Sequence, residues 1–298
     1  MILGRVVVIA LIAACSRGSD RGENRHVDDA AIVRTSDDAR RRTCGNDLSS
    51  QEIAPGLRVE RIRSWIEPPL PLGDRCLLIL RIDPARYELR LLTEREHGKR
   101  RPAPRWAADF GLVAATNASM FHDDGRSTGL MVDGDRINNG AVNVQFGAFL
   151  AFEPVAADAP PVVMLGSSCD GFDLDRLRSA YRVIVQNYRL LDCDGSALEW
   201  KDQKIYSAAA IAIDQDGHVA FILSRTPYRP KAFARMLASP RFRLRAAMYV
   251  EGGPEASVYA RAGGVEIDEV GSYETQFLED DGNSRAWPIP NVIGAAPR

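Results

Sequence analysis

The sequence lacks the motifs of several common enzyme classes. It contains no glycine-rich phosphate loop ending in Gly-Lys-Ser or Gly-Lys-Thr and no Gly-x-Ser-x-Gly motif, which excludes P-loop nucleotide chemistry and a serine nucleophile elbow. Its four histidines have neither the paired spacing nor the Cys-x-x-Cys neighbour of a usual zinc site. We therefore expect no cofactor and no metal, while a metal site assembled from residues far apart in the chain stays open.

The chain also lacks an excess of positive charge. Its 38 Lys and Arg residues and 40 Asp and Glu residues give a formal net charge of −2 at pH 7. A domain that binds DNA normally carries a clear basic excess, because it must neutralise phosphates. The composition therefore argues against nucleic acid as a partner.

The apolar run near the N-terminus is too short to cross a bilayer, which takes roughly 20 residues. Arg5 precedes this run over residues 6–14, which ends in small residues, a pattern typical of a secretory signal. The sequence Ile12-Ala13-Ala14-Cys15 resembles the bacterial lipobox, in which the cysteine is acylated. We therefore predict a signal peptide over residues 1–14 and lipidation of Cys15, with a plain secretory signal or a buried thiol as the alternatives.

Residues 16–42 are rich in Arg, Asp, Ser and Gly and include no aromatic residue, so they cannot bury enough surface to fold. We predict that residues 15–43 form a lipidated tether with a reach of about 30 Å, followed by one domain over residues 44–298. The lipid would anchor the protein to a membrane of the cell envelope. Ser16 stands where Asp would favour retention in the inner membrane, so we expect the outer membrane, facing the periplasm or the cell surface.

Four cysteines remain after Cys15. An even number in an exported protein suggests two disulfides, although four cysteines allow three pairings, and free buried thiols are the alternative. The short loops that they close favour Cys44 with Cys76 and Cys169 with Cys193.

The predicted domain is built from short strands and tight turns. Residues 76–82 form a continuous apolar run and residues 87–91 alternate apolar with polar, so we expect a hairpin that turns at Asp83-Pro84. Asp-Gly or Gly-Gly pairs predict three more hairpins, at residues 133–134, 216–217 and 263–264. Helical spacing appears within residues 106–110, 174–181 and 233–237. Together these patterns predict an α+β fold of mixed, mostly antiparallel sheets with interspersed helices.

Five segments match, in order, the pattern of one known family: residues 113–122, 129–134, 185–195, 207–213 and 247–257. The first contains Asn117-Ala118-Ser119-Met120-Phe121, which is similar to a strand end that reads Asn-Ala-Gly-Met-Tyr. The last contains Glu251-Gly252-Gly253, which is similar to a loop that reads Asp-Gly-Gly-Gly-Ser-Ser. In these segments the chain resembles the phosphodiester glycosidase family. The resemblance implies that the substrate is a carbohydrate or glycosyl phosphate.

The chain departs from the family pattern in two places. Glu251 stands where the family usually has Asp, and Pro254-Glu255-Ala256 replaces small residues. Ser207-Ala208 replaces an arginine that often precedes the central strand. These differences predict a divergent member and leave open a different substrate or a loss of activity.

Glu251 is the first candidate catalytic residue. It ends an apolar strand and is followed by Gly252 and Gly253, which would let the backbone approach a ligand closely. A carboxylate at this place is suited to act as general base or nucleophile in glycosyl transfer, with a charged surface turn as the alternative. Glu255 is either a second carboxylate of the site or a solvated side chain.

Asn117 and His122 flank a turn of small residues after a buried strand. We expect Asn117 to bind a sugar hydroxyl or to fix the turn from inside. His122 is the second catalytic candidate, a proton-transfer group, because an unperturbed histidine titrates near neutral pH. A solvated loop histidine is the alternative.

Three further polar residues are candidates for substrate binding. Arg225 follows a strand, where a guanidinium could bind phosphate with two hydrogen bonds, although a surface arginine is the simpler interpretation. Gln186 and Asn187 interrupt an apolar strand, so they are either ligand contacts or buried amides with internal partners.

These features predict a hydrolase that cleaves a glycosyl phosphodiester or related glycoside at the cell envelope. A phosphate leaving group, with a pKa of about 6, departs without much help from a general acid. The alternative is a non-catalytic glycan-binding lipoprotein of the same fold, and a purely structural envelope component is a third possibility.

Overall fold

The structure, a computed structural model, describes residues 33–34 and 44–298. The predicted signal peptide, the lipidation of Cys15 and nearly all of the predicted tether lie outside the described residues. Within the described part of the chain, no helix is both long enough and apolar enough to span a membrane.

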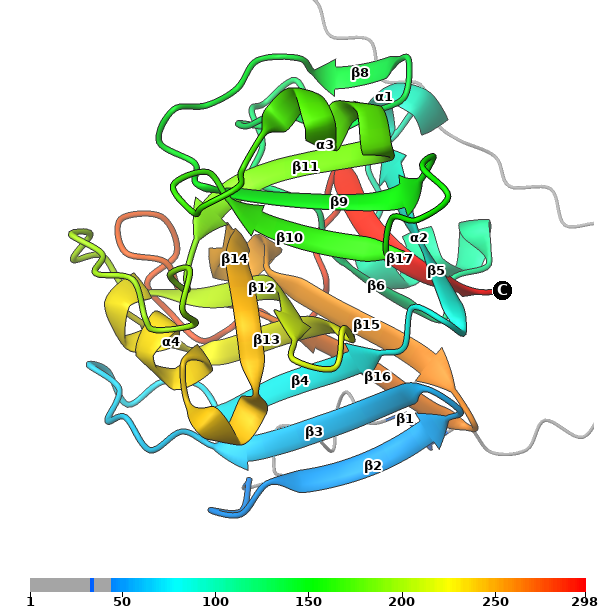
Figure 1. The fold of residues 1–298 in the computed structure, drawn as a ribbon. Coiled ribbons are helices and arrows are strands. Elements are labelled where there is room, and N and C mark those ends of the chain that lie inside the picture. Colours follow the sequence, from blue (N-terminus) through cyan, green and yellow to red (C-terminus); the bar gives the residue numbers. More distant parts are fainter. Residues whose placement is uncertain (1–32, 35–43) are drawn as a thin grey trace, which may run out of the picture. The chain divides into compact units, whose positions relative to one another are not determined.

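The strands form two sheets (Figure 1). The smaller sheet has six strands, in the order β1 (Val33–Arg34), β16 (Val265–Val270), β15 (Ser257–Ala262), β6 (Ala114–Asn117), β17 (Asn291–Pro297) and β5 (Tyr87–Thr93). The larger sheet has eleven strands, and its main path runs β10 (Val162–Gly166), β9 (Ala148–Pro154), β11 (Tyr181–Arg189), β14 (Leu244–Gly252), β12 (Tyr206–Asp214), β13 (Val219–Tyr228), β4 (Cys76–Ile82), β3 (Leu57–Arg63) and β2 (Ser49–Ala54). Strand β7 (Met131–Asp133) joins this sheet through β11 and pairs with β8 (Arg136–Asn139).

The two sheets share the largest hydrophobic core, to which both contribute alternate residues. In β4, Leu78 and Leu80 lie in this core, whereas Leu77 and Ile79 lie in a second cluster on the other face of the sheet. A strand that is buried on both faces needs apolar residues at successive positions, which explains the continuous apolar run of residues 76–82.

Helices cover parts of the outer faces. Phe233 of α4 (Pro230–Leu237) packs on the larger sheet, Trp106 of α2 (Ala103–Phe110) packs with residues of the smaller one, and Leu177 of α3 (Leu174–Ala180) packs with β9 and β11. The other described helices are α1 (Glu94–His97) and the short 3-10 helices η2 (Pro240–Phe242) and η3 (Gly253–Glu255). The predicted antiparallel sheets are present, but helices contribute so little that the fold is mostly β.

One predicted hairpin is wrong. Strand β4 belongs to the larger sheet and β5 to the smaller one, so the turn at Asp83-Pro84 carries the chain between sheets. Both edges of β4 are already occupied, by β3 and β13, which leaves no edge for β5. The other three predicted hairpins are confirmed as β7 with β8, β12 with β13 and β15 with β16.

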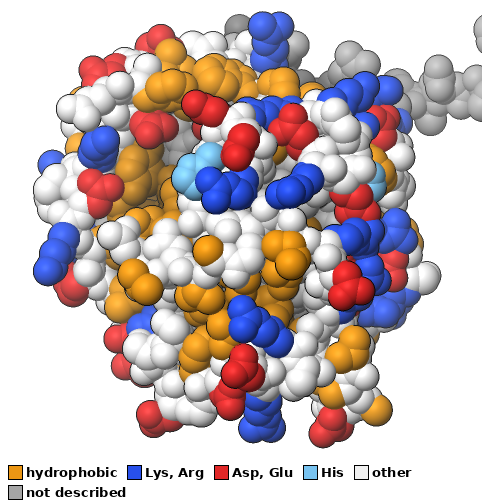
Figure 2. Space-filling model, turned by 90° about the horizontal axis from the view of Figure 1, so that it is seen from above, with side chains coloured by type: hydrophobic (Ala, Val, Ile, Leu, Met, Phe, Trp, Pro, Cys, Tyr) orange, Lys and Arg blue, Asp and Glu red, His pale blue; other side chains and the backbone are white. Residues whose placement is uncertain are grey.

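The described residues contain both disulfides with the pairing that the short loops favoured, Cys44 with Cys76 and Cys169 with Cys193. Charged side chains of both signs and apolar side chains are interspersed on the face of the molecule shown in Figure 2. This distribution agrees with the near balance of acidic and basic residues in the sequence.

Candidate active site

The end of β14 positions the first candidate residue, Glu251. Ala210 of β12 pairs with Tyr249 and Ala209 pairs with Glu251, so Val250 is an extra residue that forms a β-bulge. A bulge bends its strand and changes the direction of the side chains that follow. The side chain of Glu251 is thereby placed in the interior, where the residue is only 6% exposed.

The carboxyl group of Glu251 has one hydrogen bond and one free oxygen. The backbone N–H of Gly252 donates to Oε1 at 3.0 Å, whereas Oε2 is buried and has no hydrogen-bond partner among the described residues. Burial raises the pKa of Glu251 well above its usual value, and the negative charges of Glu255 and Glu274 raise it further. The environment therefore favours the protonated acid, with Oε2 as a hydroxyl donor, rather than the base or nucleophile expected from the sequence.

Two more carboxyl groups lie near Glu251. Burial raises the pKa of Glu255, as does the charge of Glu274, while Arg100 lowers it. Burial also raises the pKa of Glu274, and Lys204 opposes this effect. Sequence reasoning missed Glu274, because it lies in an irregular segment between β16 and β17 that carries no recognisable pattern.

The two glycines after Glu251 allow other groups to approach the backbone closely. The groups that do so are side chains of this protein. A Cβ atom on Gly252 would lie 2.2 Å from the hydroxyl of Tyr249, and one on Gly253 would lie 2.5 Å from Oε2 of Glu274. Gly253 also has a φ of 62°, in the left-handed region that favours glycine. The loop therefore brings Glu251, Tyr249 and Glu274 together around residues 252–253.

Asn117 fixes this loop from inside. Its Nδ2 donates to the backbone oxygen of Glu255 at 2.9 Å, and its Oδ1 accepts from the N–H of Ser257 at 2.9 Å. Both amide atoms are thus engaged in holding residues 255–257 against the end of β6. Of the two roles expected for Asn117, the structure shows the turn-fixing one.

The two amides in β11 differ. Oε1 of Gln186 accepts from the N–H groups of Leu130 and Asn143, and its Nε2 donates to two backbone oxygens, so Gln186 is a buried amide with a full set of internal partners. Asn187 donates through Nδ2 to the backbone oxygen of Ala118 at 2.9 Å, but its Oδ1 is buried without a partner among the described residues. Only Asn187 keeps an unused buried atom that could contact a ligand.

Arg225 is engaged by the segment that carries Glu274. Its guanidinium donates to the backbone oxygens of Val270, Asp281 and Asn283 and forms an ion pair with Asp281 at 2.7 Å. The structure therefore gives Arg225 the role of holding this segment in position. Its guanidinium has no free pair of N–H groups left for the phosphate contact expected from the sequence.

His122 makes no contact with the three carboxyl groups. It lies in an exposed turn, where its backbone N–H donates to Arg126 and its backbone oxygen accepts from Gly125. Its ring has no hydrogen-bond partner among the described residues. The structure does not join this second catalytic candidate to Glu251.

Aromatic rings form a row beside the carboxyl groups. The ring centroids of Tyr206 and Tyr249 are 5.6 Å apart, those of Tyr249 and Trp200 are 6.2 Å apart, and those of Trp200 and Tyr188 are 5.1 Å apart. The negative charges of Glu251 and Glu274 act on Tyr249, whose pKa is raised well above its usual value, mainly by burial. Tyr249 is therefore a neutral phenol next to an acidic cluster.

Comparison with known proteins identifies the family of this chain. The family model described as phosphodiester glycosidase matches residues 110–296, which include all three carboxyl groups. The catalytic domain of zebrafish N-acetylglucosamine-1-phosphodiester alpha-N-acetylglucosaminidase has a similar fold, with a TM-score of 0.56, 14% identity and coverage of 90% of this chain and 94% of that chain. A hypothetical protein from Synechocystis is also similar in fold, with a TM-score of 0.51, 12% identity and coverage of 85% of this chain and 64% of that chain. No curated protein has a significantly similar sequence.

Proposed function

Because the chain belongs to the phosphodiester glycosidase family, we propose that it hydrolyses a glycosyl phosphodiester or a related glycoside at the cell envelope. The observation that carries this proposal is the group of three carboxyls, Glu251, Glu255 and Glu274, around the loop Gly252-Gly253. Glycoside hydrolysis usually needs a pair of carboxyl groups with different protonation states.

The surroundings of the three carboxyls suggest separate roles. Glu251 is only 6% exposed, its environment favours the protonated acid, and its Oε2 has no hydrogen-bond partner among the described residues. We assign it as the donor to the oxygen that links sugar and phosphate. Glu274 lies near Lys204, which favours the charged form, and we assign it as the base.

In this scheme a water molecule attacks the anomeric carbon, and Glu274 accepts a proton from that water. The bond between the anomeric carbon and the linking oxygen breaks, and the bonding electron pair leaves with the phosphate monoester. Glu251 transfers its proton to the departing oxygen, and the carboxylate that remains takes up a proton from solvent after the products leave. Oδ1 of Asn187 is the free acceptor for a sugar hydroxyl.

The solved structure with the similar fold supports the choice of test substrates. The zebrafish enzyme is named for action on an N-acetylglucosamine-1-phosphodiester. We therefore choose a panel of sugar-1-phosphodiesters that begins with N-acetylglucosamine.

The experiment measures hydrolysis of this panel by the full chain, purified in detergent with its disulfides formed. The Glu251→Gln variant keeps the acceptor for the N–H of Gly252 but holds no transferable proton, so turnover should fall by about 100-fold or more. Glu67→Gln, at a side chain that is 79% exposed, is the control and should match the wild type. Full activity of Glu251→Gln would overturn the assignment.

A second candidate function is glycan binding without catalysis. The replacement of the usual Asp by Glu251 and of the following small residues by Pro254-Glu255-Ala256 favours it. This function predicts saturable binding of a glycan by the wild type with no product. Release of sugar and phosphate monoester would exclude it.

The envelope location has its own test. We propose that Cys15 carries the lipid anchor, because it follows an apolar run with small residues at its end. Labelled palmitate should enter the wild type and not the Cys15→Ala variant. Equal labelling of both proteins would remove the lipoprotein proposal and leave the enzymatic one intact.

A further inference from the structure

The row of aromatic rings leads from Glu251 toward the surface. Tyr249 and Tyr206, at its inner end, are 6% and 8% exposed, whereas Trp200 and Tyr188, at its outer end, are half-buried. The outer pair is in contact, with ring centroids 5.1 Å apart. The row thus joins the carboxyl groups to a part of the molecule that solvent reaches.

Polar atoms along this row are available to a ligand. The indole N–H of Trp200 and the hydroxyl of Tyr249 make no hydrogen bond with any described residue. The hydroxyl of Tyr206 lies 3.4 Å from Oδ2 of Asp202, an exposed residue at the rim. Neither of the first two donors is fully buried, so solvent, or a ligand in its place, can reach both.

Trp200 lies on residues 190–205, a long connection between β11 and β12. Connections of more than about 12–15 residues without regular structure are uncommon in compact domains and are often functional. This one is held at its base, where Leu190 donates to the backbone oxygen of Ala247 at 2.8 Å and Leu198 donates to that of Leu190 at 3.0 Å. Trp200 therefore lies just after Leu198, whose backbone is held in place by a hydrogen bond.

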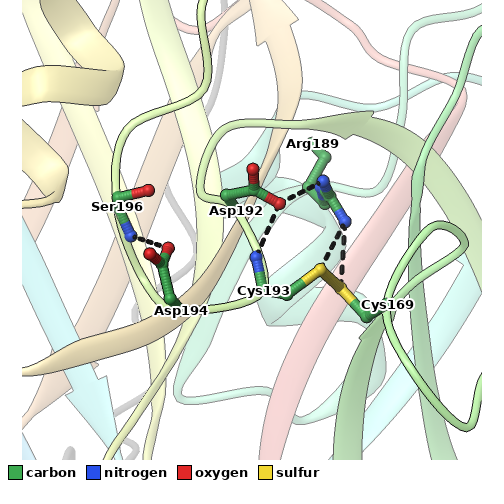
Figure 3. The surroundings of a disulfide bond; sticks show 6 residues. All are labelled: Cys169, Arg189, Asp192, Cys193, Asp194 and Ser196. Atoms are coloured by element: carbon green, nitrogen blue, oxygen red, sulfur yellow. Dashed lines mark hydrogen bonds and ion pairs between the residues drawn. A yellow bond between two sulfur atoms is a disulfide. The ribbon is translucent and has the colours of Figure 1, made fainter.

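A disulfide and an arginine hold the turn of this connection (Figure 3). Cys193 is bonded to Cys169, and Arg189 forms an ion pair with Asp192 at 2.7 Å. The guanidinium of Arg189 also lies 3.0 Å from Sγ of Cys169. These contacts fix the segment before Trp200, so that its ring is presented in one position.

We propose that the ring of Trp200 is the platform on which the sugar ring of the substrate stacks, with Tyr188, whose ring is tilted by 56° to it, as the side wall, an inference that rests on the proposed function. One face of a pyranose ring presents mainly C–H groups, which carry partial positive charge and pack favourably on the negative face of an aromatic ring. A sugar that lies on Trp200 is directed along the row toward Tyr249 and Glu251. Ligand sites of this kind combine aromatic walls with a few convergent polar groups.

Trp65 provides a matched control. It is also a partly exposed tryptophan, 47% exposed, but its ring packs on Phe242 and under the guanidinium of Arg241. Its ring does not contact the row of rings beside Glu251. Trp65→Ala therefore removes another partly exposed indole without touching the proposed platform.

The experiment has a binding readout and a kinetic one. Binding of methyl α-N-acetylglucosaminide, methyl α-glucoside and methyl α-mannoside is titrated by NMR on the Glu251→Gln protein, with and without Trp200→Ala or Trp65→Ala. We expect at least one glycoside to bind, with affinity reduced about tenfold by Trp200→Ala, equal to about 1.4 kcal/mol, and unchanged by Trp65→Ala. Trp200→Phe should restore most of the affinity, which separates loss of the ring from loss of folding.

Kinetics distinguish this inference from the proposed function. On a sugar-1-phosphodiester that the wild type cleaves, Trp200→Ala should raise KM about tenfold and leave kcat within about twofold, because the ring binds substrate and takes no part in proton transfer. Binding that depends on Trp200 without any turnover would keep the platform and refute hydrolysis. Turnover or binding that is indifferent to Trp200→Ala, or no binding of any of the three glycosides, would overturn the platform.

Discussion

Two acidic clusters of this molecule differ in what surrounds their charges. At the hairpin of β12 and β13, Asp214 is only 3% exposed, yet its carboxylate accepts from the N–H groups of Asp216 and His218 and from Arg81 at 2.8 Å. Arg243 forms an ion pair with Asp216. Each carboxylate there has an opposite charge or a hydrogen bond, so the cluster stabilises a turn.

The cluster at Glu251 is built in the opposite way. Burial raises the pKa of all three carboxyls, Oε2 of Glu251 has no partner among the described residues, and the nearby cations Arg100 and Lys204 act on the outer two. A buried group that lacks a partner costs stability, so such groups are concentrated at functional sites. The comparison teaches that the number of acidic residues in a cluster is a poor guide to function. Whether their carboxyl groups lack hydrogen-bond or charge partners is a better one.

The distances between possible metal-ligand atoms, taken alone, would have pointed to the cluster at Asp214 as the functional site. One atom each of Asp214, Asp216 and His218 lies within 4.8 Å of the others, as in a metal site. Arg81 and Arg243 already neutralise these carboxylates. We therefore interpret this cluster as structural.

The largest effect is expected from breaking the satisfied cluster. Asp214→Ala leaves the turn donors without an acceptor and removes a partner of the partly buried Arg81, so the free energy of unfolding should fall by about 3–5 kcal/mol. Urea denaturation followed by circular dichroism measures it. A loss below about 1 kcal/mol would show that this cluster does not stabilise the fold.

The two disulfides allow a matched comparison of stability and function. Replacing both Cys169 and Cys193 by Ser should cost about 3 kcal/mol of stability and also raise KM, because the segment before Trp200 is released. The same change at Cys44 and Cys76 should cost a similar stability with KM unchanged. Equal KM values for the two double variants would show that the first disulfide does not position the site.

Glu274→Gln tests whether the unsatisfied cluster holds the base. Turnover should fall by about 100-fold, equivalent to about 2.7 kcal/mol, because Gln cannot accept a proton from water. Glu279→Gln, at an exposed residue of the same segment, is the control. Activity of Glu274→Gln equal to that of the control would transfer the role of base to Glu255.

The smallest effect is a gain in stability. Burial raises the pKa of Glu251 in the folded protein above that of a glutamate in the unfolded chain, so its stabilising contribution is complete below the unfolded pKa and is lost as the pH rises toward the folded pKa. Glu251→Gln removes this loss, so we expect its Tm to lie above that of the wild type at pH 8, by an amount that decreases as the pH is lowered. At pH 4 the two proteins should melt together. A variant that is less stable than the wild type at pH 8 would contradict the raised pKa of Glu251.

Much of the local structure could be predicted from the sequence. Asp-Gly and Gly-Gly pairs located three hairpins, because these pairs adopt the positive φ angles that tight turns require. The hairpin at Asp83-Pro84 was wrong, because the choice of a partner strand depends on which edges β3 and β13 had already occupied. Local patterns specify strands and turns, whereas pairing is a property of the whole sheet.

The candidate site shows the same division. The motif at residues 251–253 identified Glu251, but Gln186 and Arg225 proved to be engaged by backbone oxygens, and Glu274 had no sequence signal. A polar residue in an apolar strand looks the same in the sequence whether its partner is a ligand or the protein. Only the structure shows which hydrogen-bond partners such a residue has.

The sequence by itself determined most of the strands and turns and the resemblance to the family, because these depend on short-range patterns of residue type. The tertiary structure alone decided how the cysteines pair, which acidic residues stand together, and which rings lie beside them. The reason is physical: burial, charge and hydrogen bonding act between residues such as Glu251 and Glu274 that are distant in the chain and meet only after folding.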